Sequence, residues 1–124
     1  MSISALPLVY SCSGCSSAGQ MANYLALRLD RTGMAEMSCI AGVGGQVRKM
    51  IRIASSGRPI IAIDGCALHC VENSLAQRQI SPDLHIRLQS LGVKKQYGAD
   101  FDSAEADQIL KTVILQAGEL SRKS

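Results

Sequence analysis

The chain has 124 residues, of which 47% are hydrophobic, 19% charged and 3% aromatic, and its formal net charge is +3. This length predicts a single domain over residues 1–124, and the hydrophobic fraction excludes an intrinsically disordered chain. The shortage of aromatic residues excludes a stacking platform for single-stranded nucleic acid. The basic residues are scattered apart from short groups at residues 48–52 and 94–95, so we expect no nucleic-acid binding.

The first half of the chain alternates strand-like with helix-like segments. Residues 6–11 form a short apolar run that ends in Ser-Cys-Ser-Gly, which is typical of a buried strand. Residues 17–31 carry apolar side chains at four-residue spacing and predict an amphipathic helix. Residues 35–40 are a weaker strand candidate that a glycine-rich break ends, and a second helix runs from about residue 47 to Gly57.

The second half continues the alternation. Residues 59–63 are an apolar, largely β-branched run that predicts a strand buried on both faces. A helix is expected over residues 66–79, and residues 84–88 alternate with period two, which indicates a strand near an edge of the sheet. A last helix is expected from residue 102 or 103 to about residue 120.

Four strands alternating with four helices predict the α/β fold class. We expect a three-layer, Rossmann-like fold with a mostly parallel four-stranded sheet, helices on both faces and strand order 2-1-3-4. This order places a topological switch point beside the first strand, which is the usual ligand site in such sheets.

The five cysteines are the most informative feature of the composition. An odd number of cysteines, in a chain whose N-terminal sequence has no signal-peptide pattern, argues against a secreted disulfide framework. No apolar stretch approaches the ~20 residues that span a bilayer. The expected protein is therefore cytoplasmic, outside the membrane, with clustered thiols that bind metal or react.

The cysteines are expected to meet at one edge of the sheet. Cys12, Cys39 and Cys66 fall at the carboxyl ends of three strands, and Cys15 and Cys70 lie in or beside the first turns of the following helices. Neighbouring strands are about 4.8 Å apart, so these thiols converge on one crevice. Helix N-termini favour the thiolate, which is the form that binds a metal ion.

A zinc site is the favoured interpretation of this cluster. Four thiolates satisfy a tetrahedral zinc ion, and Cys-x-x-Cys is a common half-site. The expected ligands come from two short segments, with an isolated fifth cysteine as the next candidate: Cys12, Cys15, Cys66 and Cys70, then Cys39.

Three polar residues lie near these thiols in the sequence. Asp64 ends an apolar buried strand and needs a partner, for which helix N-terminal amides or a proton on a ligand are candidates. We expect it to orient the loops around the thiols in preference to binding the metal directly. His69 is a weaker candidate ligand, and His85 is expected to be structural.

Two other chemistries would use the same thiols. Cys12 and Cys15 would cycle between dithiol and disulfide, or carry sulfur as a persulfide, with Cys66 or Cys70 as the resolving thiol. Four of the thiolates would otherwise hold an iron–sulfur cluster. Beyond reactive thiols the sequence contains no catalytic constellation, so enzymatic activity is left open.

Several segments together resemble the DGC-domain family of small bacterial proteins. They are residues 10–15, 39–45, 63–66, 85–88 and 92–95. The family takes its name from an Asp-Gly-Cys tripeptide, here residues 64–66, and is described as zinc-binding. The resemblance covers roughly residues 6–110 and implies a metal site at Cys12, Cys15, Cys66 and Cys70, with Cys39 next. It does not define a reaction, and it leaves protein partners unknown.

Overall fold

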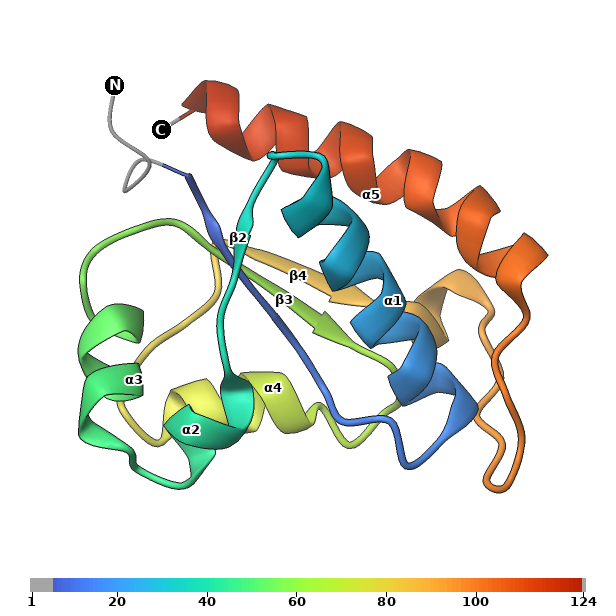
Figure 1. Ribbon diagram of the computed structural model, residues 1–124, viewed down its shortest axis with the longest axis horizontal. Helices are drawn as coiled ribbons and strands as arrows, with labels where there is room; N and C mark the ends of the chain where they lie inside the picture. The colour runs from blue at the N-terminus through green and yellow to red at the C-terminus, as the bar shows by residue number, and fades with distance from the viewer. Residues whose placement is uncertain (1–5, 124) are drawn as a thin grey trace.

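A four-stranded parallel sheet lies at the centre of the computed structural model, which describes residues 6–123 (Figure 1). Its strands are β1 (Leu8–Ser11), β2 (Glu36–Met37), β3 (Ile60–Asp64) and β4 (Leu84–Arg87). The strand order is β2-β1-β3-β4, and all three pairings are parallel. The predicted α/β class and strand order are therefore confirmed.

Helices cover both faces of the sheet and give the molecule three layers (Figure 1). The first face carries α1 (Ser17–Arg31) and α5 (Ser103–Lys123). The second face carries α2 (Ile40–Gly44), α3 (Arg48–Ala54) and α4 (Cys70–Ala76). A short 3-10 helix, η2 (Leu88–Leu91), follows β4. Within the described residues, no helix has the length and apolar character needed to cross a bilayer.

Alternation along β3 decides which side chains face which layer. Ile61 and Ile63 pack in the core under α1 and α5, whereas Ile60 and Ala62 pack in the core under α3 and α4. Because successive side chains of a strand point to opposite faces, Asp64 lies on the same face as Ile60 and Ala62. The carboxylate is therefore directed to the side of the sheet that carries α4.

Helix α1 has the bounds that its sequence predicts. Its three periodic apolar residues, Met21, Leu25 and Leu29, are all buried. The helix begins after Ser16, whose hydroxyl oxygen accepts a hydrogen bond from the Gly19 amide at 3.1 Å. A side-chain cap and a continuous apolar stripe are strong local signals, and they agree here with the tertiary packing.

Two regions differ from the predicted boundaries. The second strand is only two residues long, because Cys39 already serves as the N-cap of α2, a helix that the glycine-rich sequence did not predict. Helix α4 begins at Cys70, four residues later than the predicted start at Cys66. The segment between β3 and α4 is a loop, and in it His69 adopts a left-handed conformation with φ of 50°.

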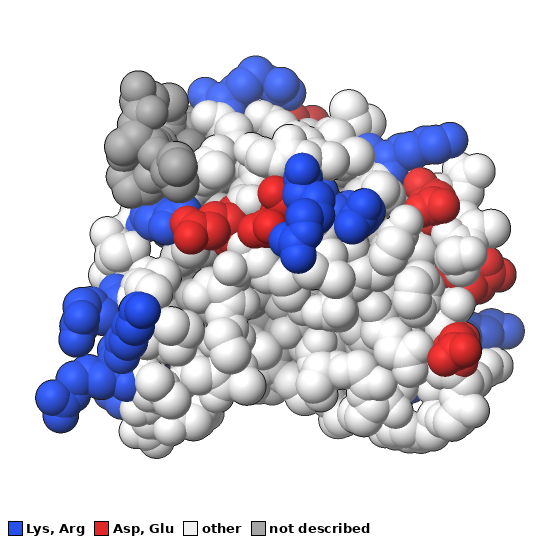
Figure 2. Space-filling view, viewed as in Figure 1, with Lys and Arg blue, Asp and Glu red and all other residues white. Residues whose placement is uncertain are grey.

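Charges are unevenly spread over the face shown in Figure 2. Lys and Arg side chains gather on the left, over α3, the helix that contains Arg48, Lys49 and Arg52. Towards the upper middle and right of this face, positive and negative side chains are interspersed. The part of this face over α3 is therefore basic, whereas elsewhere on it the two signs of charge are mixed.

Candidate functional site

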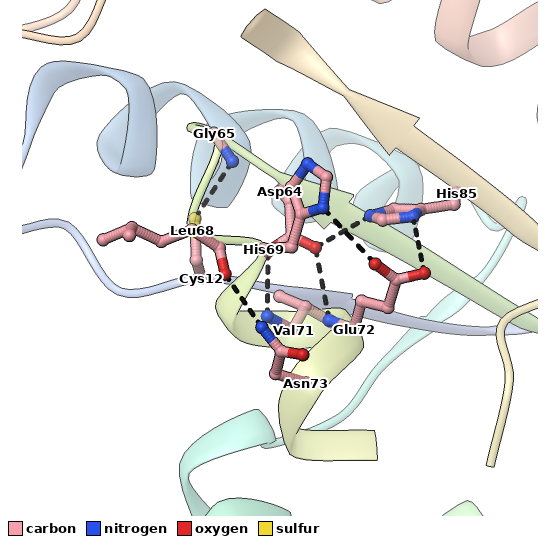
Figure 3. Close-up of polar contacts among 9 residues, drawn as sticks. All are labelled: Cys12, Asp64, Gly65, Leu68, His69, Val71, Glu72, Asn73 and His85. Atoms are coloured by element: carbon pink, nitrogen blue, oxygen red, sulfur yellow. Dashed lines mark hydrogen bonds and ion pairs between the residues drawn. The ribbon is translucent and has the colours of Figure 1, made fainter. Parts of the chain in front are cut away.

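The Asp-Gly-Cys segment meets Cys12 at the carboxyl edge of the sheet. Strands β1 and β3 pair in register up to Ser11 and Ile63, so the residues that follow them emerge side by side. The Gly65 amide donates a hydrogen bond to the Cys12 sulfur at 3.3 Å (Figure 3). Pairing of the two strands thus brings together Cys12 and the loop that carries Cys66.

Burial is the largest influence on the Cys12 thiol and raises its pKa to about 11. The charges of Asp64 and Cys66 raise this pKa further, which places both groups within electrostatic reach of the Cys12 sulfur. The hydrogen bond from Gly65 acts in the opposite direction and lowers it. Cys12 is consequently a protonated thiol at neutral pH.

We expect alkylation of Cys12 by iodoacetamide to be very slow at pH 7 and to accelerate as the pH approaches 11. Only the thiolate reacts, and a pKa near 11 leaves about one thiolate in ten thousand at pH 7. Labelling rates for each cysteine, followed by mass spectrometry from pH 7 to pH 11, measure this profile. Cys15, exposed in the same turn, is the internal control; equal labelling of the two residues at pH 7 would contradict the expectation.

Asp64 is a buried residue that binds the first turn of α4 at this site. Its side chain is 1% exposed, and its two carboxylate oxygens accept hydrogen bonds from the Val71 amide at 2.8 Å and the Glu72 amide at 3.2 Å. These amides belong to the first turn of α4, so helix N-terminal groups are partners of this buried charge. A carboxylate at this position also complements the positive end of the helix dipole. Asp64 therefore determines where α4 begins.

Two histidines extend the network from Asp64 towards the surface (Figure 3). The Nε2 atom of His85 lies 2.8 Å from an Asp64 oxygen, and its Nδ1 atom lies 3.5 Å from Glu72. A carboxylate oxygen of Glu72 also lies 3.3 Å from Nδ1 of His69. The imidazole rings of His69 and His85 pack edge to face, with their centroids 5.2 Å apart. His85 thus lies at the buried end of this network, and Glu72 is a member that the sequence did not single out.

The middle residue of the tripeptide is a glycine for a steric reason. A Cβ atom added at Gly65 would lie 2.5 Å from the carbonyl carbon and oxygen of Ala18, in the first turn of α1. Real Cβ atoms essentially never approach backbone atoms so closely. In the tripeptide, Asp64 therefore binds the first turn of α4, and Gly65 leaves room for the first turn of α1. Cys66 supplies a thiol.

The lysine after β4 and η2 also contacts this site. Lys95 is half-buried, and its ammonium group lies near the Cys66 thiol and the Tyr97 side chain. The Tyr97 contact, then the Cys66 contact, raises the pKa of Lys95, and the ammonium lies 4.6 Å from the centroid of the Tyr97 ring. The sequence identified Lys95 only as part of a basic pair, because its contact with Cys66 depends on the chain returning to the sheet edge after β4.

All five cysteines are free thiols, and they differ in exposure. Cys12 and Cys66 are half-buried, while the other three, Cys15, Cys39 and Cys70, are exposed. The Cys39 sulfur accepts a hydrogen bond from the Gly42 amide at 3.3 Å, which caps α2. Cys39 thus has a structural contact of its own at a separate helix.

The chemistry of these donors fits the predicted zinc site. Sulfur ligands in this number suit zinc. Among residues 6–122, however, no group of three or more His, Cys, Asp or Glu side chains is placed to hold a metal ion. The four-thiolate site therefore stays a prediction; the described arrangement places Cys66 within electrostatic reach of the Cys12 sulfur and of the Lys95 ammonium.

Known proteins resemble the chain over most of its length. A family model described as the DGC domain matches residues 8–113, a range that includes all five cysteines. A relative from Pseudomonas aeruginosa, named anaerobic and virulence modulator AnvM, is 58% identical over 104 residues, which cover 84% of this chain and 79% of the relative. No solved structure gives a significant match.

Proposed function

The chain belongs to the DGC domain family, and on that premise we propose that it is a regulatory protein that responds to the redox state of the cytoplasm through its thiols. The observation that carries the proposal is the position of Cys12 beside the Gly65-Cys66 segment, at the ends of two paired strands. The name of the relative, an anaerobic and virulence modulator, supports a regulatory role linked to oxygen supply.

The two thiols differ in a way that suits a two-step exchange with a small disulfide. Cys66 has the ammonium of Lys95 as a neighbour, whereas burial raises the pKa of the Cys12 thiol to about 11. The Cys66 thiolate attacks one sulfur of the small disulfide, forms a mixed disulfide and releases the other half as a thiolate. That leaving group takes up the proton that Cys66 has lost.

Cys12 completes the exchange. Its thiolate attacks the Cys66 sulfur, the Cys12–Cys66 disulfide forms, and the second half of the small disulfide leaves and takes the Cys12 proton. Two protein thiols are oxidised, and one small disulfide is reduced to two thiols. Because the pKa of Cys12 is about 11, this second step is slower at neutral pH than at alkaline pH, and the mixed disulfide on Cys66 precedes the bridge.

The test is stepwise oxidation of anaerobically purified, fully reduced protein in glutathione buffers of graded oxidation, followed by thiol titration and disulfide mapping. We expect loss of two of the five thiols and a Cys12–Cys66 bridge. Cys12→Ser should stop at a mixed disulfide on Cys66, because the resolving thiol is missing. Cys66→Ser should form no bridge, and Cys39→Ser, at the separate helix α2, should behave like the unsubstituted protein.

Metal analysis of the same samples distinguishes this proposal from the zinc or iron–sulfur alternative. We expect less than about half an equivalent of bound metal, since a closed site needs four donors within bonding distance of one ion. A full equivalent that both Cys12→Ser and Cys66→Ser remove, together with thiols that do not exchange, would replace the redox proposal with a thiolate metal site.

A further inference from the structure

A groove opens beside Cys66 at the carboxyl end of β3. It has a volume of about 730 Å³ and lies between the loop after β3 and residues 92–95. The side chains that matter for its chemistry are Cys66, Leu68, Gln89, Lys94 and Lys95. Its size falls in the range of sites that hold small organic molecules.

The charges of the groove have one sign. Lys94 and Lys95 both line it, and none of the described residues in its wall is acidic. The Lys95 ammonium lies 4.6 Å from the centroid of the Tyr97 ring and near Cys66, so it places a positive charge next to the thiol. Leu68, which is 62% exposed, and Val93 supply apolar surface in the same wall. The groove thus combines a thiol, positive charge and an apolar patch.

We propose that this groove binds a low-molecular-weight disulfide that carries carboxylate groups and presents one of its sulfurs to Cys66. The inference rests on the redox function proposed above and names the class of its oxidant. The carboxylates pair with Lys94 and Lys95, while the methylene groups beside the disulfide contact the apolar wall. The covalent step is the first exchange described above: the Cys66–sulfur bond forms, the substrate disulfide breaks, and its electron pair and the Cys66 proton go to the leaving sulfur.

The experiment compares two symmetrical disulfides of opposite charge as oxidants. Glutathione disulfide has a net negative charge and cystamine a net positive charge, and formation of the mixed disulfide on Cys66 is followed by mass spectrometry in Cys12→Ser at low ionic strength. We expect Cys66 to prefer glutathione disulfide by about tenfold, relative to the same ratio for a small reference thiol, because charge complementarity raises local substrate concentration. The ratio cancels the intrinsic reactivity of the thiol.

Substitution of the lysines tests the origin of the preference. Lys95→Gln is expected to lower the ratio about fivefold, and Lys94→Gln in the same chain to lower it further, because each removes one positive charge from the groove. Lys49→Gln, on the exposed surface of α3, makes the same change in net charge at a residue that does not line the groove. It should leave the ratio unchanged. Raised ionic strength should reduce the preference in the unsubstituted groove.

The outcomes separate this inference from the redox function. If both disulfides react equally fast, or cystamine reacts faster, while the chain with Cys12 intact still forms the Cys12–Cys66 bridge, the groove inference is wrong and the function stands. If glutathione disulfide is preferred and the bridge never forms, the groove binds an anionic disulfide and the two-thiol function is wrong. An equal ratio in Lys49→Gln and Lys95→Gln would also overturn the groove inference.

Discussion

Asp64→Asn is expected to lower the free energy of unfolding by about 3 kcal/mol, because it leaves buried donors without a charged acceptor. The carboxylate is 1% exposed and receives the amides of Val71 and Glu72 as well as Nε2 of His85. An asparagine side chain has one oxygen in place of two, and its amide group would face a donor. At least one of these contacts must therefore be lost.

Denaturation in urea measures this loss, with Asp83→Asn as the matched control. One oxygen of Asp83 accepts a hydrogen bond from the Ile60 amide at 2.8 Å, but the residue is exposed, so we expect a loss below about 1 kcal/mol. Hydrogen exchange at the Val71 and Glu72 amides should also accelerate in Asp64→Asn. Equal losses of stability in the two variants would contradict the role assigned to Asp64.

Gly65→Ala should destabilise the fold by about 3 kcal/mol, since the added methyl group meets backbone that has no room to move. The clash is with the carbonyl of Ala18 at 2.5 Å, in a helix whose inner face is buried against the sheet. Relief requires α1 to shift or the Asp-Gly-Cys loop to leave its place. Either movement also separates the Gly65 amide from the Cys12 sulfur.

Gly118→Ala in α5 is the control for the same chemical change without the clash. A Cβ atom added at Gly118 would lie 3.7 Å and 3.8 Å from the nearest side-chain atoms, which is ordinary van der Waals contact. Alanine stabilises a helix relative to glycine by up to about 1 kcal/mol. We expect unchanged or slightly higher stability in this variant, as measured by urea denaturation. Comparable destabilisation by both substitutions would show that α1 does not constrain residue 65.

Helix α2 shows why the element prediction was incomplete. Its five residues, Ile40–Gly44, include two glycines, which local propensity assigns to a break. Tertiary packing overrides this preference, because Val43 is buried in the core and a Cβ at Gly42 would lie 2.4 Å from the Met50 side chain. The long amphipathic helix α1, by contrast, was predictable because its own stripe and cap define it.

The site was predictable at the level of which loops meet and not of which atoms touch. A buried Asp64 at a strand end required a partner, and parallel strands implied that Cys12 and Cys66 would emerge together. The His85 contact depends on the register between β3 and β4, in which Ala62 pairs with His85, and on the side-chain alternation along both strands. Sequence pattern does not define that register, nor where the chain runs after β4, so the contacts of Glu72 with His85 and of Lys95 with Cys66 were missed.

The contact between Asp64 and the Val71 amide joins two residues that are seven positions apart. This hydrogen bond closes the intervening loop into a small ring, and the length of the Asp64 side chain limits how many residues the ring can contain. An inserted or deleted residue within it would move the start of α4 away from Asp64, so the number of residues between Cys66 and Cys70 is constrained by ring closure. The Cys-x-x-x-Cys spacing therefore has a mechanical origin that operates whether or not both sulfurs bind the same ligand.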